Sequence, residues 1–550
     1  MQVPPRERQP ISGRRSMIHL LSDPFLVAPT ADSVRVIWFT EASGEAHRGE
    51  YGDGLRQSVV ARTLPMSRLA EDALSRWRSP VARRTPRPIF RHEATIAPLD
   101  ARVPYRVVSI LDGETVTSDV FSLAPAPPPG TPLKILLTSD HQVLPMVAAN
   151  LEMVERTVGR VDAVFFAGDL VNVPDRASEW FDDARGNAFF PCLQGRASYT
   201  LHDRTYRGGA LIQHAPIFPA IGNHEVMGVY DPEGEALNLS YARPRRTVES
   251  ELPPEAAHWE RAVRDAWVRD RSFNTITYEE IFGLPPYYAV SFGDVRLVSL
   301  YATRLWRTPQ PGTVGRYAER DEDLADPTRW GGGEFIFEPL LGDQYDWLRQ
   351  ELESEAFQLA QYRIVMLHHP LHSLGGNVVP AYTDPVQRIA RDAEGRVTAV
   401  RYGYPKAEDH LLTHLEPLLN TSGAHLLLNG HCHLWNRFQN PAGVHFLETS
   451  NVGNTFGAHL ADNPRSPLPA GDDYVPVGDP YGLAPIVPTL APLSDAEGNP
   501  LPYLASNEIT AFSILDTGAG TVTSYRYDTR TFGAPALPFD RFALVPKSCK

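Results

Sequence analysis

Seven side chains that can bind metal ions lie within or just after short apolar runs of this chain. They are Asp140, Asp169, Asn223, His224, His368, His431 and His433. Carboxylate oxygens, amide oxygens and imidazole nitrogens together suit a pair of divalent or trivalent transition ions. An aspartate is the usual bridge in such a pair, because its two oxygens can reach two cations. The composition of this set therefore predicts a dinuclear metal site.

Buried strands are expected to carry these side chains, because each apolar run passes at its C-terminal end into Asp, Asn or His. The runs are KILLTSD, DAVFFAGD, PIFPAIGNHE, YRIVMLHHP and HLLLNGHCH. Helix-like stretches such as LPMVAANLEMVERTVGR and DQYDWLRQELESEAF lie between them. Apolar strands alternating with helices predict an α/β domain. Ligand sites in open α/β sheets lie at the C-terminal strand ends, where Gly168, Gly222 and Gly430 would allow close backbone approach.

The chain before this α/β pattern is expected to form a separate all-β domain. Residues 1–17 are polar and rich in Pro and Arg, which predicts disorder. Residues 18–125 contain only strand-like runs with turn residues between them, which is typical of a β-sandwich. In SVRVIWFT, at 33–40, Val34, Val36 and Trp38 share one face, and DGE separates the runs 104–111 and 116–123 as a hairpin turn.

A Pro-rich stretch, APAPPPGTP, is the predicted boundary between the two domains. Residues 126–550 would then form one catalytic domain that ends in a hairpin at 512–529. Loops without secondary structure are seldom long in a compact domain and commonly form lids or binding walls. Five such insertions are predicted, at 176–215, 226–272, 303–335, 373–410 and 455–505.

The runs taken together resemble the calcineurin-like metallophosphoesterase superfamily, whose pattern is D-x-H, G-D, G-N-H-[DE], an isolated His and G-H-x-H. The purple acid phosphatase-like group is the most similar branch. Its V-x-x-H-x-P is similar to VMLHHP, and the opening of its N-terminal fibronectin-type domain is similar to DPFLVAPTADSVRVIWFT. The resemblance covers roughly residues 20–455 and the last hairpin. It implies a four-layer αββα sandwich in the α/β class, preceded by an all-β immunoglobulin/fibronectin-like sandwich.

The resemblance also implies a role for each matching position. Asp169 would bridge two metal ions. One ion would also be bound by Asn223, His368 and His431, and the other by Asp140 and His433. Two cations about 3.5–4 Å apart can share a water, lower its pKa and yield a hydroxide that attacks phosphorus in line. The ions would also take up charge on the phosphoryl oxygens. The expected reaction is hydrolysis of phosphate monoesters or diesters by this metal-bridging hydroxide.

His224 is not a ligand by this resemblance. It would face the substrate and either stabilise the phosphorane or protonate the leaving oxygen, with Glu225 holding its ring. Asn223, His369 and Arg437 are further candidates for contact with the substrate, although a wall position for His369 and a surface position for Arg437 are alternatives. Cys432 is expected to point into the core behind the ligands.

The sequence departs from the superfamily at one ligand position. Gln142 stands where D-x-H has its second histidine, and Asn172 stands where purple acid phosphatases supply a tyrosine. We expect weaker metal binding there and no purple colour. Strand alternation points His141 away from Asp140, so Gln142 is favoured as the ligand, with His141 or water as alternatives. An amide oxygen favours Mn or Fe over Zn.

The bulk composition limits the classes of protein to which the chain can belong. With 550 residues it is expected to form two or more domains, and its 42% hydrophobic and 21% charged residues are those of a globular protein. The formal net charge of −14 argues against nucleic acid as a generic partner. Three cysteines are too few for a disulfide framework. Without a recognisable signal peptide or a long apolar run, the expectation is a cytosolic enzyme with no membrane partner.

Two functions are compatible with these observations. The first is a phosphatase or phosphodiesterase with two metal ions and a small phosphate ester as substrate. The second keeps the fold, has lost efficient catalysis, and binds ligands or partners through its β-sandwich and loops. The departure at positions 142 and 172 favours the second, whereas the presence of His224 and Glu225 favours catalysis.

Overall fold

The structure is a computed structural model of the chain. It describes residues 19–229, 233–237, 245–302, 317–327, 330, 342–379, 382–383, 386–465, 474–531 and 533–544. The disorder predicted for residues 1–17 and most of the insertion predicted at 303–335 lie outside these residues.

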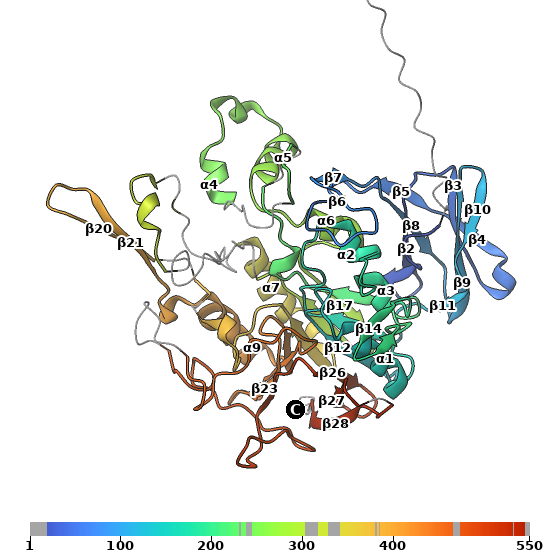
Figure 1. Ribbon diagram of the computed structural model, residues 1–550. Helices are drawn as coiled ribbons and strands as arrows, with labels where there is room; N and C mark the ends of the chain where they lie inside the picture. Colours follow the sequence, from blue (N-terminus) through green and yellow to red (C-terminus); the bar gives the residue numbers. More distant parts are fainter. Residues whose placement is uncertain are drawn as a thin grey trace, which may run out of the picture.

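Two antiparallel sheets form a sandwich at the N-terminal end (blue in Figure 1). One has the strand order β1-β2-β8-β5, and the other has the order β10-β9-β3-β4 with β11 also beside β9. Their bounds are β1 (Phe25–Val27), β2 (Val34–Thr40), β3 (Ala46–Tyr51), β4 (Gln57–Val60), β5 (Arg62–Pro65), β8 (Phe90–Ile96), β9 (Val103–Leu111), β10 (Glu114–Thr117) and β11 (Phe121–Leu123). Val34, Val36 and Trp38 share a buried core with Tyr105 and Val107 of the facing sheet, as their alternation predicted.

The outer face of the first sheet is buried as well. Phe25 and Phe39 point away from the sandwich core, and each packs 5.0 Å, centroid to centroid, from an aromatic ring of the following region, Phe190 and Phe181 respectively. These rings belong to the helices α2 (Ala177–Phe181) and α3 (Phe189–Leu193). The sandwich therefore shares a hydrophobic core with the region that follows it.

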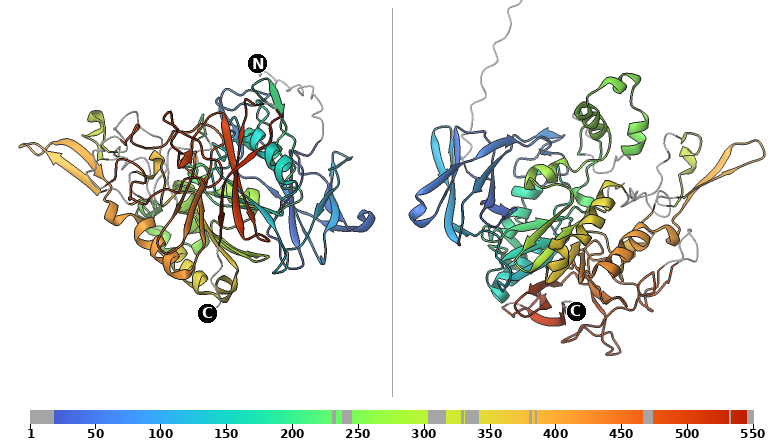
Figure 2. Two further views of the ribbon diagram at one scale, coloured as in Figure 1. Left: turned by 90° about the horizontal axis from the view of Figure 1, so that it is seen from below. Right: turned by 180° about the vertical axis from the view of Figure 1, so that it is seen from behind.

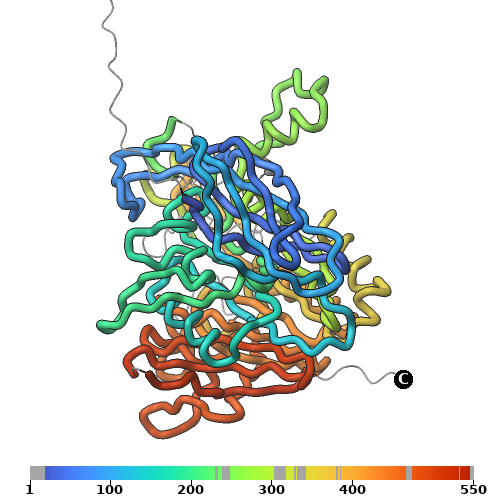
Figure 3. Tube along the Cα trace, turned by 90° about the vertical axis from the view of Figure 1, so that its right-hand side faces the viewer, coloured from blue at the N-terminus to red at the C-terminus, as the bar shows by residue number. Residues whose placement is uncertain are grey.

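Six strands form the first large sheet of the α/β region, in the order β16-β13-β12-β26-β27-β28. The first three are parallel to one another, and the last three are antiparallel. The bounds are β12 (Lys134–Thr138), β13 (Ala163–Phe166), β16 (Ile217–Pro219), β26 (Ile509–Asp516), β27 (Thr521–Asp528) and β28 (Leu537–Ala543). The C-terminal hairpin expected at 512–529 is thus β26–β27, and it pairs with β12. These strands (red) lie on the side of the molecule away from the N-terminal sandwich (Figure 3).

Seven strands form the second large sheet, in the order β17-β18-β19-β22-β24-β23-β25, with β18, β19, β22 and β24 parallel. The bounds are β17 (Tyr288–Phe292), β18 (Val295–Ser299), β19 (Tyr362–Met366), β22 (Leu426–Asn429), β23 (Trp435–Gln439), β24 (His445–Thr449) and β25 (Tyr503–Leu504). An apolar core containing Leu137, Phe165, Met366 and Leu428 lies between the two large sheets.

Helices cover the outer faces of both large sheets, which gives four layers. The first sheet packs against α1 (Val147–Val158), α2, α3 and α6 (Ile276–Phe282). The second packs against α7 (Asp343–Glu353), α8 (Glu355–Leu359) and α9 (Glu416–Ser422). The predicted αββα sandwich, preceded by an all-β sandwich, is confirmed.

The predicted insertions contain secondary structure of their own. They carry β14 (Tyr199–Leu201), β15 (Arg204–Tyr206), α4 (Arg245–Ser250), α5 (Arg261–Arg271), β20 (Val386–Arg391) and β21 (Val397–Gly403). The β20–β21 hairpin projects from the molecule at the end opposite the N-terminal sandwich (Figure 2). A membrane-crossing helix is not found among the described residues, since none is both long and apolar enough.

Candidate metal centre

The C-terminal ends of parallel strands from both large sheets meet at one place. Asp140 follows β12 and Asp169 follows β13 in the first sheet, whereas His368 follows β19 and His431 follows β22 in the second. All four side chains are buried. The site is therefore built in two halves, one from each sheet.

The backbone turns sharply at the candidate ligands. Asp140, Asp169, His431 and His433 have φ of 58°, 56°, 88° and 55°, in the left-handed region that residues with a side chain seldom adopt. Such conformations cost on the order of 1–3 kcal/mol each, persist where the surroundings hold them, and gather at functional sites. The turns direct the side chains across the gap between the sheets instead of along the strands.

Two glycines permit the close approach of these side chains. A Cβ at Gly222 would lie 2.2 Å from Asp169 Oδ1, and a Cβ at Gly430 would lie 2.2 Å from Asp140 Oδ2. Neither distance is possible for a real side chain, so both positions require glycine. Gly168 is similarly close to the backbone of Gly222.

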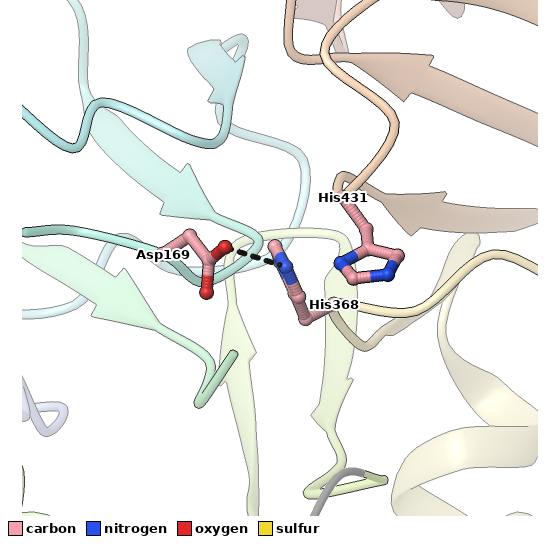
Figure 4. Close-up of side chains that lie close together, drawn as sticks. All are labelled: Asp169, His368 and His431. Carbon is pink, nitrogen blue, oxygen red and sulfur yellow. Dashed lines mark ion pairs between the residues drawn. The ribbon is translucent and has the colours of Figure 1, made fainter. Parts of the chain in front are cut away.

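Asp169, His368 and His431 form the centre of the site (Figure 4). Their potential ligand atoms all lie within 4.8 Å of one another. Asp169 Oδ2 is 3.0 Å from His368 Nε2. Asp140 Oδ1 lies 3.9 Å from the same nitrogen and 3.4 Å from His433 Nε2. The two aspartates and three histidines thus form one contiguous cluster.

Backbone carbonyls fix the direction of three imidazole rings. The Nδ1 atoms of His224, His368 and His433 lie 2.8, 2.8 and 2.9 Å from the carbonyl oxygens of Asn172, Ala167 and Asn454. A carbonyl oxygen can only accept, so each Nδ1 carries the proton and donates. In the neutral ring the Nε2 atom then has a free lone pair, and this is the usual arrangement of a histidine that binds metal.

The cluster as a whole fits cations. Asn223 Oδ1 is buried and has no hydrogen-bond partner among the described residues, although such a group normally has one. Burial opposes the protonation of His368, yet Asp169 and Asp140 raise its pKa to about 10. The same cluster lowers the pKa of Asp169, against the effect of its burial, through His368 and His224. These buried carboxylates stabilise a positive charge on the neighbouring imidazole. A metal ion bound between them would supply that positive charge in place of the proton.

Glu225 has a different contact from the one the sequence suggested. Its carboxylate accepts the backbone N–H groups of Asp169, Leu170 and Gly222 at 2.8, 2.8 and 2.7 Å. It therefore ties the loop of Asp169 to the loop of Asn223, and the prediction that it holds the ring of His224 was wrong. The Asn172 carbonyl oxygen has that role. Burial and the nearby Asp169 raise the pKa of Glu225 to about 8.

Gln142 and His141 lie on opposite sides of the loop that follows β12. The Gln142 side-chain Nε2 donates to Asp169 Oδ2 at 2.6 Å, so its side chain faces the cluster. His141 turns into the core, with Nε2 at 3.1 Å from Thr138 Oγ1 and its ring edge-on to Phe166. Burial lowers the pKa of His141 to about 3. The Asn172 side chain donates to the backbone carbonyl oxygen of Gln142 and does not replace the missing tyrosine.

The two other predicted substrate contacts lie in different places. His369 is buried, with its ring 4.1 Å, centroid to centroid, from that of His431, and burial followed by the charge of His368 keeps its pKa well below the usual value. Arg437 lies on β23, 3% exposed, with its guanidinium on both carboxylate oxygens of Asp540 at 2.8 and 3.1 Å. The prediction that Arg437 reaches substrate or lies at the surface was therefore wrong, because this ion pair holds it between strands.

Some residues that shape the site could not be identified in the sequence. Glu448 on β24 accepts from the backbone N–H of Cys432 at 2.7 Å and from Ser373 and Ser450. Burial and Asp140 raise its pKa to about 8. Cys432 is buried behind the histidine loop, as expected for its side chain. The contribution of Asn172 and Asn454 is a backbone oxygen, for which a sequence contains no signal.

Four layers of this kind, with Asp, Asn and His converging at the strand ends of both sheets, are typical of metal-dependent phosphoesterases. Residues 133–434 match the family model for calcineurin-like phosphoesterases. The match spans more than half of the chain, which therefore belongs to the calcineurin-like phosphoesterase family, a family that hydrolyses phosphoesters and uses dinuclear metal centres.

One solved structure agrees with the fold. A purple acid phosphatase from yellow lupin (Lupinus luteus) seeds has 15% identity and a TM-score of 0.51, over 94% of this chain and 73% of its own. At that identity the likeness shows the fold alone. GAP50, described as the anchor in the inner membrane complex of Plasmodium, aligns at 10% identity over 76% of this chain and 90% of its own, with a TM-score of only 0.33. None of the curated proteins matches the chain.

Proposed function

We propose that the chain hydrolyses phosphate esters with two metal ions, Mn or Fe in preference to Zn. The observation that carries the proposal is the buried convergence of Asp169, His368 and His431 within 4.8 Å. The proposed ligands are Asp140, Gln142, Asp169, Asn223, His368, His431 and His433. When bound, the ions would lower the pKa of water and neutralise charge on the phosphoryl oxygens.

His224 is the proposed general acid. Its side chain is 17% exposed, whereas those of Asp169 and His368 are 2% and 0% exposed, so it is the histidine of this group that substrate can reach. The Asn172 carbonyl holds Nδ1, which leaves Nε2 on the side of the cluster, 4.0 Å from Asp169 Oδ2. A proton on Nε2 would pass to the leaving oxygen of the ester as its bond to phosphorus breaks.

An aromatic leaving group is the proposed preference within the class of phosphate esters. Phe456 is 62% exposed, and its ring stacks on that of His433 with centroids 5.2 Å apart and planes at 28°. The Asn507 side chain accepts from the backbone N–H of Thr455 at 3.1 Å and so holds this loop. An exposed ring beside the cluster would stack with a flat aromatic group of the substrate.

Purified protein should be analysed for metal content and then assayed with added Mn²⁺ on p-nitrophenyl phosphate and on its bis-ester. The proposal expects at least one tightly held metal ion per chain and turnover of at least one ester. Asp169→Asn is the matched loss-of-metal control, because it keeps the shape of the side chain and removes the proposed bridging charge. Fewer than one metal ion and no hydrolysis of either ester would favour the alternative, a fold of this family that binds ligands without efficient catalysis.

The domain boundaries at 17, 125 and 126 and a cytosolic location stay predictions. Localisation of the chain in cell fractions and limited proteolysis between 124 and 132 would test them.

A further inference from the structure

A chain of buried charged residues connects the N-terminal all-β region to the loop that holds His224. Asp72 lies next to β6 (Ala70–Glu71), in that region. Both of its carboxylate oxygens accept from Arg176 Nη2, at 3.0 and 3.2 Å. The other end of the same guanidinium donates from Nη1 to Glu179 Oε1 at 2.8 Å. These three residues, the Asp72–Arg176–Glu179 chain, are 1%, 8% and 4% exposed.

Glu179 also binds the backbone of the loop beside the metal centre. Its Oε2 accepts from the backbone N–H groups of Asn172 and Val173 at 2.7 and 3.0 Å. The carbonyl oxygen of Asn172 in turn accepts from His224 Nδ1. The Asn172 side chain also donates to the Gln142 carbonyl at 2.5 Å, so the same loop borders both sides of the cluster.

We propose that Asp72 is a positioning residue for the hydrolysis: through Arg176 and Glu179 it fixes the Asn172 carbonyl oxygen that orients His224. The inference rests on the proposed function, because it assumes that His224 protonates the leaving oxygen. A carboxylate on Arg176 holds the guanidinium fork in one orientation, which in turn holds Glu179 against two backbone amides. Without it, Arg176 keeps one partner and Glu179 gains freedom to rotate.

A general acid that is misplaced affects some substrates more than others. An ester with a poor leaving group, such as phenyl phosphate, needs the proton, whereas 2,4-dinitrophenyl phosphate leaves as a stable anion without one. Because misplacement by about 1 Å can cost on the order of a hundredfold, Asp72→Asn should lower kcat for phenyl phosphate by about ten- to a hundredfold. It should leave kcat for the dinitrophenyl ester, both KM values and the metal content nearly unchanged. A loss of folded protein would lower kcat for both esters by the same factor, so it can be distinguished from a misplaced general acid.

Arg196→Gln is the matched control. Arg196 joins the same two parts of the chain through Asp23 and Asp119 and makes no contact with residues 170–173, so its loss should leave the ratio of the two rates unchanged. Arg176→Lys is a second variant in case Asp72→Asn fails to fold, because an ammonium group cannot hold both carboxylates in a fork. It should change the ratio in the same direction.

A double mutant separates this inference from the proposed function. In the His224→Ala protein the ratio of kcat for phenyl phosphate to kcat for the dinitrophenyl ester should already be low. Asp72→Asn should lower it no further, since both residues act through the imidazole of His224. If wild type and His224→Ala differ in the ratio but neither Asp72→Asn nor Arg176→Lys changes it, the inference is overturned and the proposed function stands. If wild type hydrolyses neither these monoesters nor the corresponding diesters, or His224→Ala keeps the wild-type ratio, the proposed role of the site fails and the inference with it.

Discussion

Asp169 contacts both halves of the site, through each of its carboxylate oxygens and through its backbone. One oxygen accepts from the backbone N–H of His224 at 2.9 Å, and the other contacts Gln142 and His368. Glu225 holds its backbone. Changes at Asp169 should therefore disturb metal and loops together, whereas changes at His224 should affect catalysis alone.

His224→Ala should lower kcat by about 10²- to 10⁴-fold, the usual contribution of general acid catalysis, and leave the metal content intact. The reason is that the ring contacts the Asn172 carbonyl and faces the cluster, while the proposed ligands remain in place. Steady-state kinetics and elemental analysis of the same preparation check this. Loss of metal from the variant would show that His224 is itself a ligand.

Gln142→His should increase metal retention, because it restores the imidazole that relatives place at this position. We expect about tenfold tighter binding in a chelator titration, in line with ligand changes of this kind. Asn172→Ala is the comparison. The Asn172 side chain contacts a backbone oxygen, so this substitution removes no ligand and should leave the metal affinity unchanged. Equal retention in wild type and Gln142→His would indicate that position 142 does not face a metal.

Phe456→Ala should raise KM for aryl esters more than for alkyl esters. An aromatic pair contributes about 0.5–1.5 kcal/mol beyond area burial, so the expected increase for phenyl phosphate is roughly two- to tenfold. Competitive inhibition by phenyl and by butyl phosphonate measures the difference without turnover. An equal change for both classes would show that Phe456 only supports the loop.

At the scale of elements, the parallel strands determine which residues can meet. The sequence predicted which side chains the strand ends bring together, because an apolar strand that ends in Asp or His places that side chain at one edge of a sheet, whereas their binding of metal stays a prediction. It predicted Arg437 wrongly, because its partner Asp540 is 103 residues away on β28 and no local pattern connects them. The run 116–123 was expected as one strand, but the Ser118 hydroxyl accepts from the backbone N–H of Val107 and the pairing with β9 then shifts by one residue, so β10 and β11 are separate.

Gly222→Ala should abolish metal binding, since the new Cβ would overlap Asp169 Oδ1 at 2.2 Å and displace that carboxylate. Backbone strain is not the cause, because Gly222 has φ of −101°. Gly403→Ala on β21 is the matched control, as its Cβ would have no neighbour nearer than 3.9 Å. Metal content should fall to background in the first variant only; retention in Gly222→Ala would contradict the close approach.

At the scale of the whole molecule, one buried histidine between two carboxylates makes stability depend on pH. His372 Nδ1 lies 3.0 Å from Asp479 and Nε2 lies 3.6 Å from Glu416. Burial opposes protonation, but these carboxylates raise the pKa of His372 to about 9. Since the folded pKa exceeds the unfolded value of 6.5, the stabilisation is complete below pH 6.5 and is lost as the pH rises through 9.

The free energy of unfolding should therefore fall by about 3 kcal/mol between pH 6.5 and pH 9 through this group. His372→Asn removes the titration, so its difference from wild type should shrink over the same range. Denaturant titrations at several pH values measure it, with His258→Asn as control because His258 is exposed. A constant difference between wild type and His372→Asn would contradict the prediction.

The aromatic outer face of the first sandwich sheet has a consequence for synthesis of the chain. Phe25 and Phe39 leave the ribosome with the sandwich, but the helices that cover them end only at Leu193 and, for α6, at Phe282. At about 5–20 residues per second, roughly ten to thirty seconds pass between the end of β11 and the end of α6. During that interval the nascent chain exposes an apolar sheet face, so the sandwich cannot complete its outer packing before α6 has been synthesised.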